Sequence, residues 1–450
     1  MSSFAIGGIV VLIMAVLMVL GVPIAFALGL TALISVVVFL DVAQLNFFGN
    51  FVFDSLNNFA LLSIPLFVLM GVIFGQSKAS GDLFETTNMW LSRLRGGLAM
   101  SSIVASAIFA ALTGSSPATS AAIGRVAIPE MRKRGYSNEV STGAIVAGGT
   151  LGILIPPSVT LILYGISTES SIGQLFLGGV VPGIMVTVLF CLWILIAVTL
   201  QQRGVAAQES SGQSMAAEAA AAPEYTWGER FSSLVKVLPF VVLIAAVLGV
   251  LYLGIATPSE AAAVGALFSF LLVAVLYRQA RWNRLMDMAL ETTRTSTMIL
   301  MIVAFSAVIG QVLSFLNVPQ DLAGAIAELQ INRWLVFVAM NVLFLVLGFF
   351  LPPVSIILIT MPVLFPIITA LGFDPIWFGV VMTLNMEMGL ITPPVGLNLY
   401  VVQGIAPDVP LRDILAGAIP YVAVLAVGIL ILAIFPGMVT WLPNQVLGGG

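Results

Sequence analysis

The chain contains no histidine and a single cysteine, Cys191, among its 450 residues. Without histidine it lacks the commonest proton-relay residue and metal ligand. One cysteine inside an apolar run provides neither a disulfide nor a cysteine-based metal site. An intramembrane enzyme would therefore have to rely on Ser/Thr, Asp/Glu or Lys/Arg chemistry, and we expect no enzyme activity and no cofactor.

Charged residues are also scarce, at 8% of the chain, whereas 60% of the residues are hydrophobic and the mean hydropathy is +1.14. The formal net charge of −4 indicates little about partners when the charges are confined to loops, and no nucleic-acid partner is expected. Apolar runs of eighteen or more residues recur from end to end. This pattern predicts an all-α polytopic membrane protein with the lipid bilayer as its surroundings.

Clusters of glycine and proline interrupt several of the apolar stretches, and they divide the chain into predicted helices. Residues 1–38 lack a basic n-region and an A-x-A cleavage pattern, so we interpret them as retained helices. The predicted spans are 4–39 (divided at 21–23), 58–75, 96–129 (broken at 113–117), 139–166 (broken at 156–157), 175–200, 234–253, 260–277, 295–316, 334–371 (broken at 352–353), 378–402 (broken at 393–394) and 414–441.

Two further segments are predicted to lie outside the bilayer core. Residues 83–95 are amphipathic and 278–294 are basic, and both are expected at a membrane surface. We divide the chain into 1–56, a first repeat at 57–200 with a hairpin at 96–130, a hydrophilic linker at 201–233, further helices at 234–294, and a second repeat at 295–441 with a hairpin at 334–371.

Two stretches share one skeleton of helix-breaking residues, with members at offsets 0, 6, 7, 23, 27 and 28. Such an internal repeat of Gly/Pro-interrupted apolar segments is the best sequence indication of the binding site of a secondary transporter. The first copy consists of Pro129, Gly135, Tyr136, Gly152, Pro156 and Pro157, and the second of Pro366, Gly372, Phe373, Gly389, Pro393 and Pro394.

Basic residues indicate how the two repeats are oriented, because Lys and Arg are enriched on the cytoplasmic side. Four clusters lie around 78–95, 132–134, 203–236 and 278–294. If all four are cytoplasmic, the segment 96–129 begins and ends inside, and 334–371 begins and ends outside. Both are then re-entrant hairpins, and they enter from opposite faces of an inverted repeat.

Broken helices at membrane depth leave backbone N–H and C=O groups free, which is tolerated only where protein or a water-filled cavity satisfies them. Freed carbonyls suit a hard cation such as Na⁺, and helix N-termini suit a carboxylate. An alternative interpretation is that the breaks are only kinks relieved by neighbouring helices. The candidate Na⁺ ligands are Ser116, Thr119, Gly152, Pro156, Ser355, Glu387, Gly389, Thr392 and Pro393, and the candidate substrate-binding residues are Arg125, Ser115, Ser116, Pro353 and Asn398.

Arg125 and Glu387 are ionisable residues inside predicted spans, where such residues are by default functional candidates. Arg125 is a candidate partner of an anionic substrate, or it extends to the inner surface near Pro129. Glu387 is a candidate for carrying a proton or holding a cation, or it is a structural partner of Arg125 or of backbone amides.

Several motifs together resemble those of the large membrane (M) subunit of tripartite ATP-independent periplasmic (TRAP) transporters, the DctM-like family. The resemblance covers nearly the whole chain. The motifs are Gly114-Ser115-Ser116-Pro117-Ala118-Thr119, Ile128-Pro129-Glu130-Met131, Gly135-Tyr136, Gly152-Ile153-Leu154-Ile155-Pro156-Pro157-Ser158 and Leu390-Ile391-Thr392-Pro393-Pro394-Val395-Gly396.

The resemblance implies a multi-pass permease of a bacterial or archaeal inner membrane that takes up an organic acid with Na⁺ as the coupling ion. It also implies two partners, a small membrane subunit (Q) and a periplasmic solute-binding protein (P). Residues 1–56 and 234–294 would form a scaffold, against which the two repeats move as an elevator. The alternative is an inverted-repeat secondary carrier of anions that acts alone, and the two are distinguished by dependence on the partner proteins.

Overall fold

A computed structural model describes residues 2–206, 225–277, 282–328 and 331–448, and these residues form helices joined by turns, with no strand among them. Seven of their helical segments are long and apolar enough to cross a membrane. The number rises to eight if Ala43–Leu56 and Phe59–Gly75, bent by 60° at their junction, count as one span. The prediction of an all-helical polytopic membrane protein is therefore confirmed.

The first half of the chain places most of its helix breaks where glycine and proline predict them, but Pro129 of the repeated skeleton lies inside the helix Ser116–Lys133 and does not break it. Gly114 and Ser115 separate α6 from α7, and Pro156-Pro157 separates α8 from α9. The helices are α1 (Ser3–Val19), α2 (Ile24–Phe39), η1 (Val42–Phe47), α3 (Phe48–Leu56), η2 (Phe59–Leu62), α4 (Ser63–Gly75), α5 (Ala79–Leu91), α6 (Gly97–Thr113), α7 (Ser116–Lys133), α8 (Asn138–Leu154), α9 (Val159–Ser167) and α10 (Ile172–Ala206).

The second half repeats this order, as α7 and α17 begin 237 residues apart and so do α8 and α18. The repeat inferred from the sequence thus extends over hairpin, broken helix and the long helix that follows. The helices are α12 (Trp227–Tyr252), α13 (Pro258–Leu276), α14 (Trp282–Phe315), α15 (Val318–Glu328), α16 (Arg333–Gly348), α17 (Pro353–Ala370), α18 (Pro375–Leu390), α19 (Leu397–Ile405), α20 (Leu411–Ile434) and α21 (Gly437–Leu447).

In each copy of the repeat, the glycine and the aromatic residue at offsets 6 and 7 form the turn that ends the second arm of the hairpin. Gly135 and Gly372 have positive φ angles of 83° and 71°, a conformation that glycine adopts without steric cost. In each turn the glycine N–H bonds the carbonyl three residues back, and the aromatic N–H bonds the carbonyl five back, at 3.0–3.2 Å. Ser137 and Asp374 then cap the following helices.

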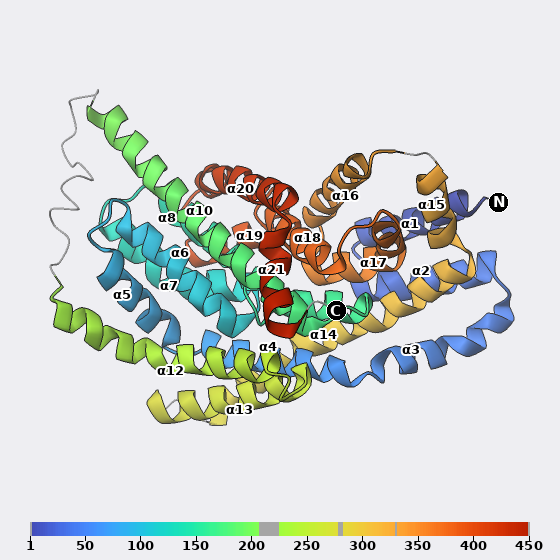
Figure 1. The fold of residues 1–450 in the computed structure, drawn as a ribbon, viewed down its shortest axis with the longest axis horizontal. Helices are drawn as coiled ribbons and strands as arrows, with labels where there is room; N and C mark the ends of the chain where they lie inside the picture. The colour runs from blue at the N-terminus through green and yellow to red at the C-terminus, as the bar shows by residue number, and fades with distance from the viewer. Residues whose placement is uncertain (1, 207–224, 278–281, 329–330, 449–450) are drawn as a thin grey trace.

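The broken helices lie at the centre of the molecule. Along Asn138–Ser167, which contains α8 and α9, 94% of the apolar window is buried inside the protein, against 28% for Ile172–Leu200 in α10. Figure 1 shows α5, α6, α7 and α8 toward one end and α15, α16 and α17 toward the other, with α18 between the two groups. The outer helices therefore carry the apolar surface suited to lipid, and the break between α8 and α9 is enclosed.

Two of the predicted helix boundaries are wrong. The basic stretch within 278–294 is not a separate surface segment where it is described, because α14 runs unbroken from Trp282 to Phe315 and contains no proline. The final span is not one helix, since Pro436 lacks an N–H and separates α20 from α21. The linker lies largely outside the described residues, with α10 reaching Ala206 and α12 starting at Trp227.

Candidate functional site

The tip of the first hairpin gathers hydroxyl and carbonyl oxygens. Gly114 ends α6 with a φ of 58°, and the extended backbone of Ser115 starts α7. The hydroxyls of Thr113 and Thr119 lie 2.8 Å apart, and that of Thr119 also donates to the Ser115 carbonyl at 2.9 Å. Ser116 and Thr119 are fully buried. Thr113 belongs to the same polar run but is not among the residues predicted for the site.

The break between α8 and α9 closes directly on this tip. A β-carbon placed on Gly152 would lie 2.5 Å from the Ser115 carbonyl oxygen and 2.8 Å from the Ser116 nitrogen, and one on Gly114 would lie 2.8 Å from the Pro157 carbonyl oxygen. Glycine is therefore needed where these backbones meet. The structure brings the predicted Ser115, Ser116 and Thr119 of the tip together with Gly152, and it brings Gly114 to Pro157, the neighbour of the predicted Pro156.

The second half of the chain contributes a residue to this first site. Asn398 of α19 is fully buried, and its amide donates to the Ser116 hydroxyl at 2.7 Å and to the Val146 carbonyl at 3.3 Å. Its carbonyl oxygen has no hydrogen-bond partner in the described part of the chain. Reciprocally, α9 of the first half packs against α17. Each short helix after a break thus completes the hairpin of the other half.

The second hairpin tip meets its own broken helix, α18, by contact of two glycines. A β-carbon on Gly389 would lie 2.6 Å from the Gly348 Cα, so Gly348 is a site residue that the sequence analysis did not single out. Ser355 is fully buried, and its hydroxyl has no partner among the described residues. Pro353 is buried beside it at the start of α17.

The two breaks differ in exposure. Pro156 and Pro157 are buried, whereas Pro393 and Pro394 are exposed and Thr392 is half-buried. The Thr392 hydroxyl donates to the Met388 carbonyl at 2.5 Å, the last turn of α18. The second break therefore lies at a surface of this chain, and the first is enclosed by its neighbours.

The two ionisable candidates lie apart from each other. Glu387 on α18 is fully buried and neither carboxyl oxygen has a hydrogen-bond partner in the described residues, whereas Arg125 is exposed on α7. No ion pair joins these two described residues, so the interpretation of Glu387 as a partner of Arg125 is wrong for this conformation. Its interpretation as a partner of backbone amides fails in the same way.

A pair of amides next to the second site, the buried Asn385 and the half-buried Asn341, was not predicted. The Asn385 side chain donates to both the backbone and the side-chain oxygen of Asn341 at 3.0 Å, linking α18 to α16. The Asn385 carbonyl oxygen has no partner among the described atoms. Isolated amides inside apolar spans are costly, and this was the signal that could have identified them.

A family model described as "Tripartite ATP-independent periplasmic transporter, DctM component" matches residues 11–438. A C4-dicarboxylate TRAP transporter large permease protein DctM from Pseudomonas aeruginosa is 36% identical over 392 residues, covering 87% of this chain and 88% of that protein. A sialic acid TRAP transporter large permease from Vibrio cholerae is 29% identical over 430 residues, covering 96% of each.

Two solved transporters share the fold at low identity. The YdaH transporter of Alcanivorax borkumensis aligns with a TM-score of 0.60 and 14% identity, covering 88% of this chain and 90% of that one. MtrF of Neisseria gonorrhoeae aligns with a TM-score of 0.55 and 14% identity, covering 91% and 86%. These similarities concern the architecture alone.

Proposed function

Because this chain belongs to the DctM family of tripartite ATP-independent periplasmic transporters, we propose that it carries an organic acid across a bacterial or archaeal inner membrane, coupled to Na⁺. The observation that carries this proposal is that two hairpin tips, the first of them rich in hydroxyl groups, meet two broken helices and are each completed by the other half. A site built between two inverted repeats suits alternating access. Its oxygen atoms suit a hard cation.

Each tip supplies a different set of Na⁺ ligands in this proposal. The first set consists of oxygens of Ser116, Thr119, Gly152 and Pro156 around the enclosed break. Its support is the close approach of the Gly152 backbone to Ser115. The second set consists of oxygens of Ser355, Gly389, Thr392 and Pro393, joined by the carbonyl of Gly348. The carboxyl oxygens of the buried Glu387 complete the second set, and they have no hydrogen-bond partner among the described residues.

The organic acid is proposed to bind between the tips, near Ser115, Ser116, Pro353 and Asn398. The free carbonyl oxygen of Asn398 suits a hydroxyl or N–H group of the solute, and the N-termini of α7 and α17 suit its carboxylate. Arg125 is exposed on α7 and is proposed to meet the solute on its way to or from the site. Carboxylates are named for several relatives, including C4-dicarboxylates and sialic acid.

The crossed packing supports a movement of both hairpins as one body. Since α19 lies on α7 and α9 on α17, neither hairpin can move without the other half. We propose that this body moves as an elevator against a scaffold formed by residues 1–56 and 234–294. It would receive solute from a periplasmic binding protein and work with a small membrane subunit, without enzyme activity of its own.

Uptake by proteoliposomes tests the proposal. Uptake is expected to require the small subunit, the binding protein and an inward Na⁺ gradient. Ser116→Ala and Thr392→Ala are expected to raise the Na⁺ concentration needed for half-maximal uptake. Thr199→Ala is the matched control, because Thr199 makes the same bond to the carbonyl four residues back, in α10.

Two outcomes would oppose the proposal. Uptake by this chain alone would favour the stand-alone anion carrier instead. An unchanged Na⁺ requirement in both Ser116→Ala and Thr392→Ala would exclude the proposed ligand sets, while leaving membership of the family untouched.

A further inference from the structure

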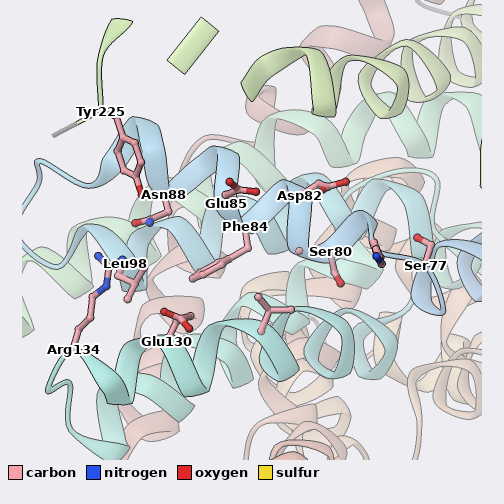
Figure 2. A pocket seen from close by; sticks show the side chains of 13 residues that line it. Ser77, Ser80, Asp82, Phe84, Glu85, Asn88, Leu98, Glu130, Arg134 and Tyr225 are labelled. Carbon is pink, nitrogen blue, oxygen red and sulfur yellow. The ribbon is translucent and has the colours of Figure 1, made fainter. Parts of the chain in front are cut away.

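A cleft of about 630 Å³ lies between α5 and the second arm of the first hairpin, away from the two broken helices. Its floor is apolar and includes Phe84, Leu98 and Val126, and its rim is polar. Figure 2 shows α5 crossing above the cleft and α7 below it, with Tyr225 entering from the chain that precedes α12. None of the residues proposed for Na⁺ or solute lines this cleft.

Every carboxylate in the cleft wall already has a partner. One partner lies on α12 and one directly after α13, so they hold α5 against those helices, and the third is on α7 itself. The contacts are Asp82 with the Tyr277 hydroxyl at 2.6 Å, Glu85 with Lys236 at 2.9 Å, and Glu130 with Lys133 at 2.8 Å.

The cations that line the cleft have no such partners. Arg134 is half-buried and Lys78 is exposed, and within the described residues neither forms an ion pair. A guanidinium in such a position is suited to a phosphate or carboxylate, which it binds through two parallel hydrogen bonds. The cleft therefore offers a charge that an anionic group of a ligand can satisfy.

The side chain of Asn88 is the second feature of the cleft that indicates a ligand. Its side chain is 7% exposed and lines the cleft, and its carbonyl oxygen has no hydrogen-bond partner in the described chain. A buried acceptor left unpaired is costly, so a ligand that brings an N–H or O–H donor is favoured. In Figure 2 the side chains of Asn88, Tyr225 and Arg134 lie at the same end of the cleft.

The surroundings indicate a ligand from the membrane. Trp90 on α5 packs edge-on against Trp227 and Phe231, which lie just after Tyr225 in the chain. These rings are 36%, 63% and 59% exposed. Exposed tryptophans of this kind are enriched where a membrane protein meets the lipid headgroups. The cleft is thus expected at headgroup depth, with an apolar floor for the glycerol region of a lipid.

We propose that this cleft binds a phosphoethanolamine group, with its phosphate at Arg134 and its ammonium donating to the Asn88 carbonyl oxygen. Two of the three wall carboxylates are paired with lysines, whereas Asp82 is paired only with the neutral Tyr277 hydroxyl, so the wall favours a headgroup that also carries an ammonium. The same group occurs in phosphatidylethanolamine of the bilayer and in soluble phosphoethanolamine. The apolar floor favours the lipid. This proposal needs only that the chain spans the membrane, not that it transports any solute.

Phosphatidylcholine distinguishes the proposal from general lipid adhesion, because its quaternary nitrogen has no N–H to donate. The full-length chain, purified in detergent, is mixed with short-chain phosphatidylethanolamine, phosphatidylcholine or phosphatidylglycerol, or with soluble phosphoethanolamine. Binding is followed by native mass spectrometry and by the shift of the melting temperature. We expect tight binding of phosphatidylethanolamine and at least about tenfold weaker binding of phosphatidylcholine, the effect of one charge-assisted hydrogen bond.

Substitutions of cleft residues test whether the lipid binds in the cleft. Arg134→Gln and Asn88→Leu are expected to weaken phosphatidylethanolamine binding about tenfold or more. Arg132→Gln is the matched control, because Arg132 is two residues away and pairs with Asp408, neither of which lines the cleft. Each variant is first compared without lipid by gel filtration, and the lipid comparison on the parent chain stands even if a variant does not fold.

Each outcome of these binding measurements either supports or overturns the proposed phosphoethanolamine site. Preferred binding of phosphatidylethanolamine that Arg134→Gln and Asn88→Leu lose, and Arg132→Gln keeps, supports the proposal. Equal affinity for soluble phosphoethanolamine supports the same site and identifies the soluble source. Equal binding of phosphatidylcholine or phosphatidylglycerol, or loss of binding in the control as well, overturns it. These measurements do not involve transport. A negative result in lipid binding therefore does not bear on the proposed uptake function, and a negative result in the uptake assay does not bear on the proposed lipid site.

Discussion

Replacement of Gly152 by alanine tests whether the first hairpin tip and α8 must touch for Na⁺ to bind. The new β-carbon would lie 2.5 Å from the Ser115 carbonyl oxygen and 2.6 Å from its carbonyl carbon. Both atoms are backbone, so no side chain can turn away. The tip must retreat by about 0.9 Å to reach the 3.4 Å of ordinary van der Waals contact.

The size of the effect follows from that displacement. Overpacking of a tight contact costs about 1–3 kcal/mol, and the better helix propensity of alanine offsets up to about 1 kcal/mol. The variant is therefore expected to fold, with a net loss of roughly 0–3 kcal/mol. Binding sites tolerate displacements of about 0.5 Å, so Ser115 and Ser116 would leave the proposed Na⁺ position. We expect at least about a tenfold higher Na⁺ requirement, a loss of about 1.4 kcal/mol in binding.

The assay is solute uptake as a function of Na⁺ concentration in proteoliposomes that contain all three components. Gly404→Ala is the control, because it also lies in a helix and has nothing within 4 Å of its β-carbon position. The control should keep the parent Na⁺ requirement. If folded Gly152→Ala had the same half-saturating Na⁺ concentration as Gly404→Ala, the contact would not position a ligand.

Three further predictions concern other contacts. Asn398→Ala should destabilise the protein by about 1–3 kcal/mol in chemical unfolding, since the buried Ser116 hydroxyl loses its partner; a neutral change would contradict the linkage of the two halves. Gly135→Ala should lower the free energy of unfolding by about 1 kcal/mol, because alanine adopts a φ of 83° only with strain. An unchanged midpoint of chemical unfolding would contradict the role of Gly135 in this turn. The bond from Arg132 lowers the pKa of Asp408 below its ordinary value of 3.8. Stabilisation by this pair is present above that value and is lost as the pH falls through the lowered pKa, so the small difference in melting temperature between the parent and Asp408→Asn should be seen at neutral pH and vanish in strong acid.

The fold was largely predictable because helix breakers leave a local signal. Gly135 and Gly372 end helices with positive φ angles, and proline pairs interrupt α8–α9 and α18–α19, as the sequence predicts. Hydropathy alone was less informative where a helix leaves the bilayer. The polar start of α14 contains no helix breaker, so the helix continues through it.

The site was predictable as a set of segments but not as a set of contacts. Serine, threonine and glycine at the breaks indicated oxygen ligands, yet nothing local shows that Asn398 reaches Ser116 rather than its own hairpin. Exposure also depends on how distant segments pack. Pro156 and Pro393 occupy the same position in the repeat, yet Pro156 is buried and Pro393 is exposed. In the sequence, Arg125 and Glu387 are equally good candidates for a functional role. The folded chain buries Glu387 and exposes Arg125.

The bond between Asn398 and Ser116 also bears on how the chain is made. The two residues are 282 positions apart, so at about 5–20 residues per second the ribosome delivers the second roughly 14–56 s after the first. During that time the buried hydroxyl of Ser116 has no partner from α19, and desolvating it would be costly. The first hairpin must therefore remain next to water or the insertion machinery until α19 is synthesised. A chain cut short before Leu397 would contain every residue of the first hairpin and still be unable to complete its tip.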